Sequence, residues 1–84
     1  MDKRDRFAAN LRRARKAAGV SQEELAERCE LHRTEVSLLE RGGREPRLGT
    51  LVKLATALGT TAEALCTGIS WDAQQREYKI DESS

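Results

Sequence analysis

The chain has 84 residues, of which 35% are charged and 4% are aromatic, and its formal net charge is +1. This length makes one small domain, and so few aromatic residues favour an all-α fold with a small aliphatic core over a β-sandwich or barrel. No apolar run approaches the ~20 residues of a membrane span, and the first residues do not resemble a signal peptide. We therefore expect a cytoplasmic protein without a membrane partner.

The first helix is predicted over residues 3–18 by one apolar stripe at helical spacing. The stripe consists of Phe7, Leu11, Ala14 and Ala18. Gly19 follows directly, and glycine often follows the last turn of a helix because it readily adopts a left-handed backbone. We expect the helix to end there.

Residues 21–42 have the pattern of two short helices joined by a tight turn. Ser21 is a good N-cap, and Glu24 completes a capping box, which predicts a helix from residue 22 to about residue 29. Residues 30–31 form the turn, and the next helix runs from residue 32 or 33 to residue 40. The side chains expected to face inward are those of Leu25, Ala26, Cys29, Leu31, Val36 and Leu39. Two helices crossing in this way form a helix-turn-helix, which offers its second helix to a DNA groove.

Two more helices are predicted beyond a loop at residues 41–46, where two glycines and a proline cannot continue a helix. The fourth helix is expected at residues 48–58, with an inward stripe made of Leu48, Leu51, Val52, Ala55 and Leu58. Thr61 caps a short fifth helix that ends at Gly68. Its inward residues are Ala62, Leu65 and Cys66.

The tail alternates apolar and polar residues at residues 69–71 and 78–80, which is the period of a β-strand. Residues 72–76 are the turn between them. An isolated two-stranded hairpin is only marginally stable in water. We therefore expect this hairpin-like tail, residues 69–84, either to pack on the helices of a DNA-binding domain at residues 1–68 or to pair with a second copy of the chain. The predicted dimer contact consists of Trp71, Tyr78 and Ile80.

Four outward residues near the start of the third helix have the chemistry that reads DNA bases. Arg33 can give two hydrogen bonds to guanine, and Thr34 and Ser37 can donate or accept. Glu35 either accepts from a cytosine amino group or repels phosphate and limits where the helix binds. The expected partner is double-stranded DNA.

Phosphate contacts are expected from residues at both ends of this unit. Gln22 lies in the first turn of the second helix, where free backbone N–H groups attract anions. His32, Arg41 and Arg44 flank the third helix. Residues 1–20 carry seven Lys/Arg against two Asp, and residues 41–59 carry four against one Glu. Local charge governs phosphate attraction, so the near-neutral total does not exclude DNA.

The chain resembles the phage-repressor and Cro type of helix-turn-helix protein, the XRE family, over about three-quarters of its length. The matching segments are residues 11–15 (LRRAR), 19–22 (GVSQ), 24–26 (ELA), 36–42 (VSLLERG), Pro46 and 51–59 (LVKLATALG). The resemblance implies a five-helix, lambda-repressor-like DNA-binding domain with helix 3 in the major groove, and an internal ion pair between Arg15 and Glu40. The sequence departs from the family at Leu38, where a polar reader is common, and in the tail after Gly68.

The leading hypothesis is a transcriptional regulator, a repressor, that binds a near-palindromic operator as a homodimer. The alternative is a protein-interaction module, such as an antitoxin, whose tail binds a partner protein. An enzyme is not expected because no catalytic constellation or phosphate loop is present, and no cofactor or small-molecule substrate is predicted. Cys29 and His32 have a spacing that could begin a metal site, but Cys66 is the only further soft ligand, so we predict no metal.

Overall fold

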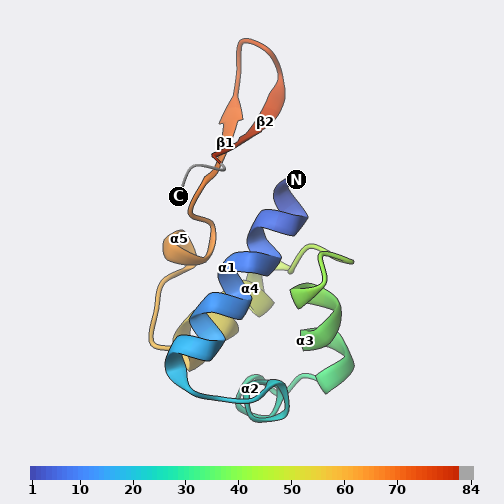
Figure 1. Cartoon of the computed structure of the whole chain (residues 1–84), viewed down its shortest axis with the longest axis vertical. Coiled ribbons are helices and arrows are strands. Elements are labelled where there is room, and N and C mark those ends of the chain that lie inside the picture. The colour runs from blue at the N-terminus through green and yellow to red at the C-terminus, as the bar shows by residue number, and fades with distance from the viewer. Residues whose placement is uncertain (82–84) are drawn as a thin grey trace.

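The computed structural model describes residues 1–81, which form five helices and one two-stranded antiparallel sheet (Figure 1). The elements are α1 (Lys3–Ala18), α2 (Gln22–Cys29), α3 (Arg33–Glu40), α4 (Leu48–Ala57), α5 (Ala62–Leu65), β1 (Ile69–Asp72) and β2 (Glu77–Ile80). The expected helical fold with a C-terminal hairpin is confirmed. No helix among residues 1–81 combines the length and apolar character needed to cross a membrane.

Local capping interactions set the ends of the first two helices. Ser21 and Glu24 form the predicted capping box at the start of α2. A second box, between Asp2 and Asp5, begins α1 and was not predicted. Gly19 ends α1 with φ at +73°, and its N–H donates to main-chain oxygens of the last turn. The caps therefore satisfy backbone groups that a helix end leaves without partners.

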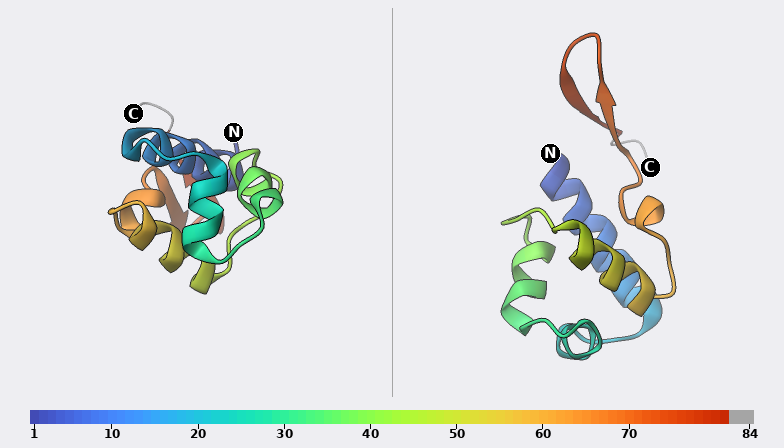
Figure 2. Two further views of the ribbon diagram at one scale, coloured as in Figure 1. Left: turned by 90° about the horizontal axis from the view of Figure 1, so that it is seen from below. Right: turned by 180° about the vertical axis from the view of Figure 1, so that it is seen from behind.

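The five helices enclose one aliphatic core. Helix α1 packs against α3 and α5, while α2 packs against α3 and α4. In Figure 2, α4 crosses the side of α1 that is hidden in Figure 1. The buried side chains of the core come from Phe7, Leu11, Val20, Leu25, Ala26, Cys29, Val36, Leu39, Leu54, Ala55 and Leu65. Leu31 lies in the turn between α2 and α3 and packs against this core as expected.

The predicted inward face of α4 was partly wrong. Leu48 is 77% exposed and Val52 is also exposed, whereas Leu54, which the predicted stripe omitted, is completely buried. The helix instead turns Leu51, Leu54 and Ala55 toward its neighbours, and Leu58, which follows its last residue, also packs against the core. Leu48 and Val52 are as apolar as the residues that are buried, so the spacing of apolar letters alone could not place the face. Ala18, predicted in the stripe of α1, is likewise exposed because it lies at the helix end.

The hairpin of β1 and β2 projects from the helical body along the long axis of the molecule (Figure 1). Its register pairs Ile69 with Ile80 and Trp71 with Tyr78. Because directly paired residues share one face of a sheet, these four side chains make an apolar face. The opposite face carries Ser70, Asp72, Glu77 and Lys79. The tail predicted at residues 69–84 also includes residues 82–84, which lie outside the described residues.

Two polar side chains of α1 anchor the base of the hairpin. Arg6 Nε donates to the main-chain oxygen of Thr67 at 3.0 Å. Asn10 Nδ2 donates to the oxygens of Leu65 and Thr67, both at 2.9 Å. Gly68 has φ at +87°, and a Cβ there would lie 2.7 Å from Arg6 Nε. The chain can therefore turn from α5 into β1 only where glycine allows a close approach to α1.

Candidate nucleic-acid interface

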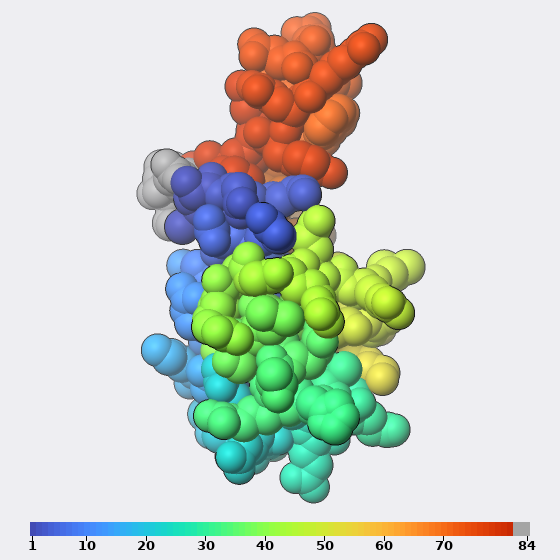
Figure 3. Space-filling model, turned by 90° about the vertical axis from the view of Figure 1, so that its right-hand side faces the viewer, coloured from blue at the N-terminus to red at the C-terminus, as the bar shows by residue number. Residues whose placement is uncertain are grey.

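Helix α3 is held from behind and free on its outer face. Val36 and Leu39 are fully buried against the helices around them. Arg33 and Thr34 are exposed in the first turn, and Ser37 is half-buried one turn later. Figure 3 views the molecule from this side, with α3 and the loop after it below the protruding hairpin. Three of the predicted base readers thus lie together on a supported helix.

Arg33 has only a loose partner. Its Nε lies 3.9 Å from Oε1 of Glu23 on α2, and both side chains are mostly exposed. An exposed ion pair at that distance contributes little free energy. The guanidinium of Arg33 can therefore leave Glu23 to bind a base edge. His32 is exposed as well, and its side chain makes no capping hydrogen bond to α3.

Glu35, the fourth predicted base reader, is already paired. Its Oε1 lies 2.6 Å from Nη1 of Arg44, a residue predicted to contact phosphate. The structure therefore joins two residues to which the sequence assigned separate roles. Arg41, by contrast, is exposed, and its Nε donates to the main-chain oxygen of Ser37 at 3.3 Å.

A buried charge network ties α3 to α1 and α2. The Glu40 side chain is only 2% exposed, and Arg15 contacts both of its carboxylate oxygens, Nε at 2.6 Å and Nη2 at 3.0 Å. Gln22 Nε2 donates to the same carboxylate at 3.1 Å. The hydrogen bonds to Glu40 raise the pKa of the Arg15 guanidinium. A two-pronged, desolvated pair of this kind fixes geometry strongly.

This network changes what Gln22 can offer to DNA. One N–H of its side-chain amide donates to Glu40, which leaves the second amide N–H and the backbone N–H in the first turn of α2 for a phosphate. Sequence reasoning missed this link and also missed Arg12, whose Nη1 donates to the main-chain oxygen of Glu40. The partners lie 18 and 28 residues apart, and no motif quoted for the family resemblance pointed to either link.

Leu38 packs under the loop that follows α3. A Cβ on Gly43 would lie 2.5 Å from Leu38 Cδ1, and the Gly43 N–H donates to the Leu38 main-chain oxygen at 3.0 Å. The departure from the family pattern at Leu38 therefore has a structural explanation. The two glycines at 42–43 were the available signal, since paired glycines often mark close backbone approach.

Comparison with known proteins identifies the class of this fold. The family model described as Helix-turn-helix (HTH_3) matches residues 11–65. The chain belongs to the helix-turn-helix family, of the XRE type. Members of this family are DNA-binding transcriptional regulators.

Several helix-turn-helix proteins resemble the chain over most of its length. Control protein C.SmaI of Serratia marcescens is 43% identical over 67 residues, covering 80% of each chain. The restriction-modification controller protein C.AhdI from Aeromonas hydrophila has a crystal structure with a TM-score of 0.71 at 42% identity, covering 74% of this chain and 94% of that one. The hypothetical transcription factor NHTF from Neisseria gives 0.73 at 40% identity, covering 88% and 80%.

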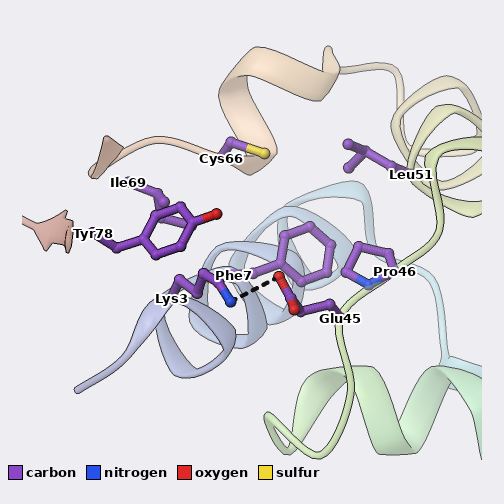
Figure 4. A pocket seen from close by; sticks show the side chains of 8 residues that line it. All are labelled: Lys3, Phe7, Glu45, Pro46, Leu51, Cys66, Ile69 and Tyr78. Atoms are coloured by element: carbon purple, nitrogen blue, oxygen red, sulfur yellow. Dashed lines mark ion pairs between the residues drawn. The ribbon is translucent and has the colours of Figure 1, made fainter. Parts of the chain in front are cut away.

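A small apolar cavity lies where the hairpin meets this helix-turn-helix unit (Figure 4). It has a volume of about 220 Å³ and is lined by Lys3, Phe7, Glu45, Pro46, Leu51, Cys66, Ile69 and Tyr78. Lys3 Nζ lies 3.2 Å from Glu45 Oε1 and 4.7 Å from the centre of the Tyr78 ring. The cavity therefore adjoins the apolar face of the hairpin at Tyr78.

Among residues 1–81, no three or more His, Cys, Asp or Glu side chains are arranged so that they could hold a metal ion. Cys29 is buried, while His32, three positions later in the chain, is exposed. Burial raises the pKa of both the Cys29 and Cys66 thiols. Both cysteines are therefore protonated near neutral pH and act as apolar side chains.

Proposed function

We propose that this protein is a sequence-specific DNA-binding regulator that inserts α3 into the major groove. One observation carries the proposal: Arg33, Thr34 and Ser37 share the free face of a helix whose other side is locked by its core contacts and by Glu40. A rigidly held helix with adaptable polar donors on its outer face suits direct readout of base edges. Residues 1–68 form the DNA-binding unit in this proposal.

Backbone contacts would position α3 on the duplex. The first-turn N–H groups of α2 begin the helix-turn-helix, and His32 and Arg41 flank α3 at its two ends. In the proposed complex these groups would contact phosphates on either side of the groove. Arg44, the fourth residue expected at a phosphate, instead lies 2.6 Å from Glu35. Phosphate contacts set orientation, whereas base contacts select sequence.

The proposal includes a homodimer on a near-palindromic operator in the cytoplasm. One domain reads few base pairs, and a two-fold symmetric dimer reads two half-sites about 34–36 Å apart. Trp71 and Tyr78 are 55% and 52% exposed on the apolar face of the hairpin, and their rings make an edge-to-face contact at 5.0 Å. Ile80, the third predicted contact, is half-buried at the hairpin base. A preformed aromatic pair of this kind suits a self-complementary contact.

The test is selection of bound sequences from a random DNA pool by the full-length protein, with its mass in solution measured in parallel. A palindromic motif bound by a dimer is the expected result. Transcription from a promoter overlapping that motif should then fall when the protein is added, as repression requires. A folded protein that enriches no motif would overturn the proposal and favour the protein-interaction module, with the hairpin as its binding surface.

A narrower version is favoured by the relatives. C.SmaI is named a control protein, and C.AhdI is named a restriction-modification controller. At 42–43% identity to both, this chain is a candidate controller of restriction–modification genes. The selected motif should then lie upstream of a neighbouring endonuclease or methyltransferase gene. Its absence there would reject the narrower version and leave the DNA-binding proposal intact.

A further inference from the structure

The contact between Glu35 and Arg44 joins the reading helix to the loop behind it. The distance of 2.6 Å from Arg44 Nη1 to Glu35 Oε1 is that of a short charge-assisted hydrogen bond. The Glu35 side chain is 25% exposed and that of Arg44 is 56% exposed. Glu35 is therefore the more enclosed partner, and its carboxylate bonds to a guanidinium that is itself mostly exposed.

The loop conformation brings Arg44 back to α3. Gly42 has φ at +75°, and a Cβ there would lie 2.5 Å from Asp5 Oδ1 at the start of α1. Gly43 lies against Leu38, as described for the interface. The loop thus contacts α1 at Gly42 and α3 at Gly43. These contacts fix the backbone that carries Arg44, so its side chain is placed near Glu35, nine positions earlier in the chain.

The negative charge of Glu35 opposes the insertion of α3 into DNA. Residues 21–40 carry six Glu against two Arg, so the helix-turn-helix itself is acidic. The carboxylate of Glu40 is buried with Arg15, but Glu35 lies in the first turn of α3, beside Arg33 and Thr34. A bare carboxylate there would repel the phosphates on either side of the groove.

We propose that Arg44 is a positioning residue that masks the charge of Glu35 and stays paired with it in the DNA complex, rather than contacting a phosphate. The inference rests on the proposed DNA-binding function and deepens it. In this proposal Arg44 increases the affinity for DNA because it removes the repulsion between the Glu35 carboxylate and the DNA phosphates. Arg44 should then matter only while Glu35 is charged.

The experiment is a double-mutant cycle with E35Q, R44Q and the combined variant. Affinity is measured for the duplex recovered by selection and for a random-sequence duplex of the same length, over a range of salt concentrations. R41Q, made with and without E35Q, is the matched control because Arg41 bonds to Ser37 and not to Glu35. Circular dichroism checks that each variant is folded.

We expect R44Q to weaken binding about tenfold in the natural background and less than about twofold beside E35Q, a coupling of the size seen between residues in contact. The slope of the logarithm of the binding constant against the logarithm of the salt concentration should be the same for E35Q and for E35Q/R44Q. Loss of a phosphate contact would instead reduce the size of that slope by about 0.9. R41Q should reduce the DNA affinity by the same factor with and without E35Q.

If R44Q reduces the DNA affinity as much in the E35Q protein as in the natural protein, or more, the masking role is overturned and Arg44 is a phosphate contact. Failure of the unmodified protein to bind either duplex would overturn the proposed function itself, and this inference with it. The two failures are therefore distinguishable, because the first occurs with intact salt-dependent binding by the unmodified protein.

Discussion

At the scale of single residues, burial separates the two acidic side chains of α3. Glu40 is enclosed with Arg15 and Gln22 and joins three helices, whereas Glu35 remains partly open to solvent beside Arg44. Removing one partner of an enclosed pair leaves an uncompensated charge, while an open pair contributes little stability. The same residue type is therefore enclosed in the protein at the end of α3 and partly exposed, in the proposed DNA interface, at its start.

Arg33 is the residue on which sequence readout is predicted to depend most directly. We expect Arg33→Ala to reduce specific binding by about 1–3 kcal/mol and to relax the preference at one base pair, because a two-pronged contact to guanine is lost. Arg41→Ala should weaken selected and random duplexes alike. Competition binding with single-base variants of the operator measures both effects. An equal loss on both kinds of duplex for Arg33→Ala would contradict its role as a base reader.

At the scale of elements, α4 shows how packing selects among equally apolar residues. Leu54 faces the core, and Val52, two positions earlier, faces solvent. Helix α4 packs against α2 and α5. Leu51 of α4 and Leu65 of α5 belong to the same apolar cluster. The loop before α4 carries Pro46, which lines the cavity at the hairpin base.

This arrangement predicts opposite outcomes for two similar substitutions on α4. Leu54→Ala should lower the free energy of unfolding by about 2–5 kcal/mol, because it opens a cavity in the core. Val52→Ala should change it by less than about 0.5 kcal/mol, as expected for an exposed site. Urea denaturation followed by circular dichroism gives both values. Similar losses for the two variants would show that α4 presents a different face to the core.

At the scale of the whole molecule, the hairpin and α3 occupy different parts of the surface. The principal extents are 41 × 21 × 19 Å, and the hairpin extends the long axis beyond α1 (Figure 1). A dimer contact there would leave the outer face of α3 open to DNA. The aromatic pair is on one face of the hairpin, and Lys79 is on the other, paired with Asp72 and Glu77.

Replacing the aromatic pair should separate dimerisation from folding. We expect W71S/Y78S to keep the helical content of the natural protein but to sediment as a monomer. Its affinity for the full operator should fall, while its affinity for an isolated half-site should not. K79S, on the polar face, is the matched control and should remain dimeric. Should the double variant, or a chain truncated after Gly68, still form a dimer, the contact lies elsewhere.

Much of this protein was determined by its sequence through short-range interactions. The Ser21–Glu24 capping box, the glycine after α1 and the alternation in the tail each act within a few residues, so they predicted the helices and the hairpin close to their observed bounds. The pattern from α2 to α3 was specific enough to indicate the family. The outward residues of α3 followed from the same pattern, because helical period alone separates them from Val36 and Leu39.

The family resemblance implied one contact between distant residues, the Arg15–Glu40 ion pair, and the structure contains it. Only the tertiary structure decided the others. The buried face of α4, the bond from Gln22 to Glu40 and the pairing of Glu35 with Arg44 all depend on how helices and loops are placed relative to one another. Many positions along the chain carry similar apolar or charged side chains, so the sequence pattern alone does not identify which of them will be partners. The choice is made when the core packs, because that step sets the few ångströms within which a hydrogen bond forms or fails.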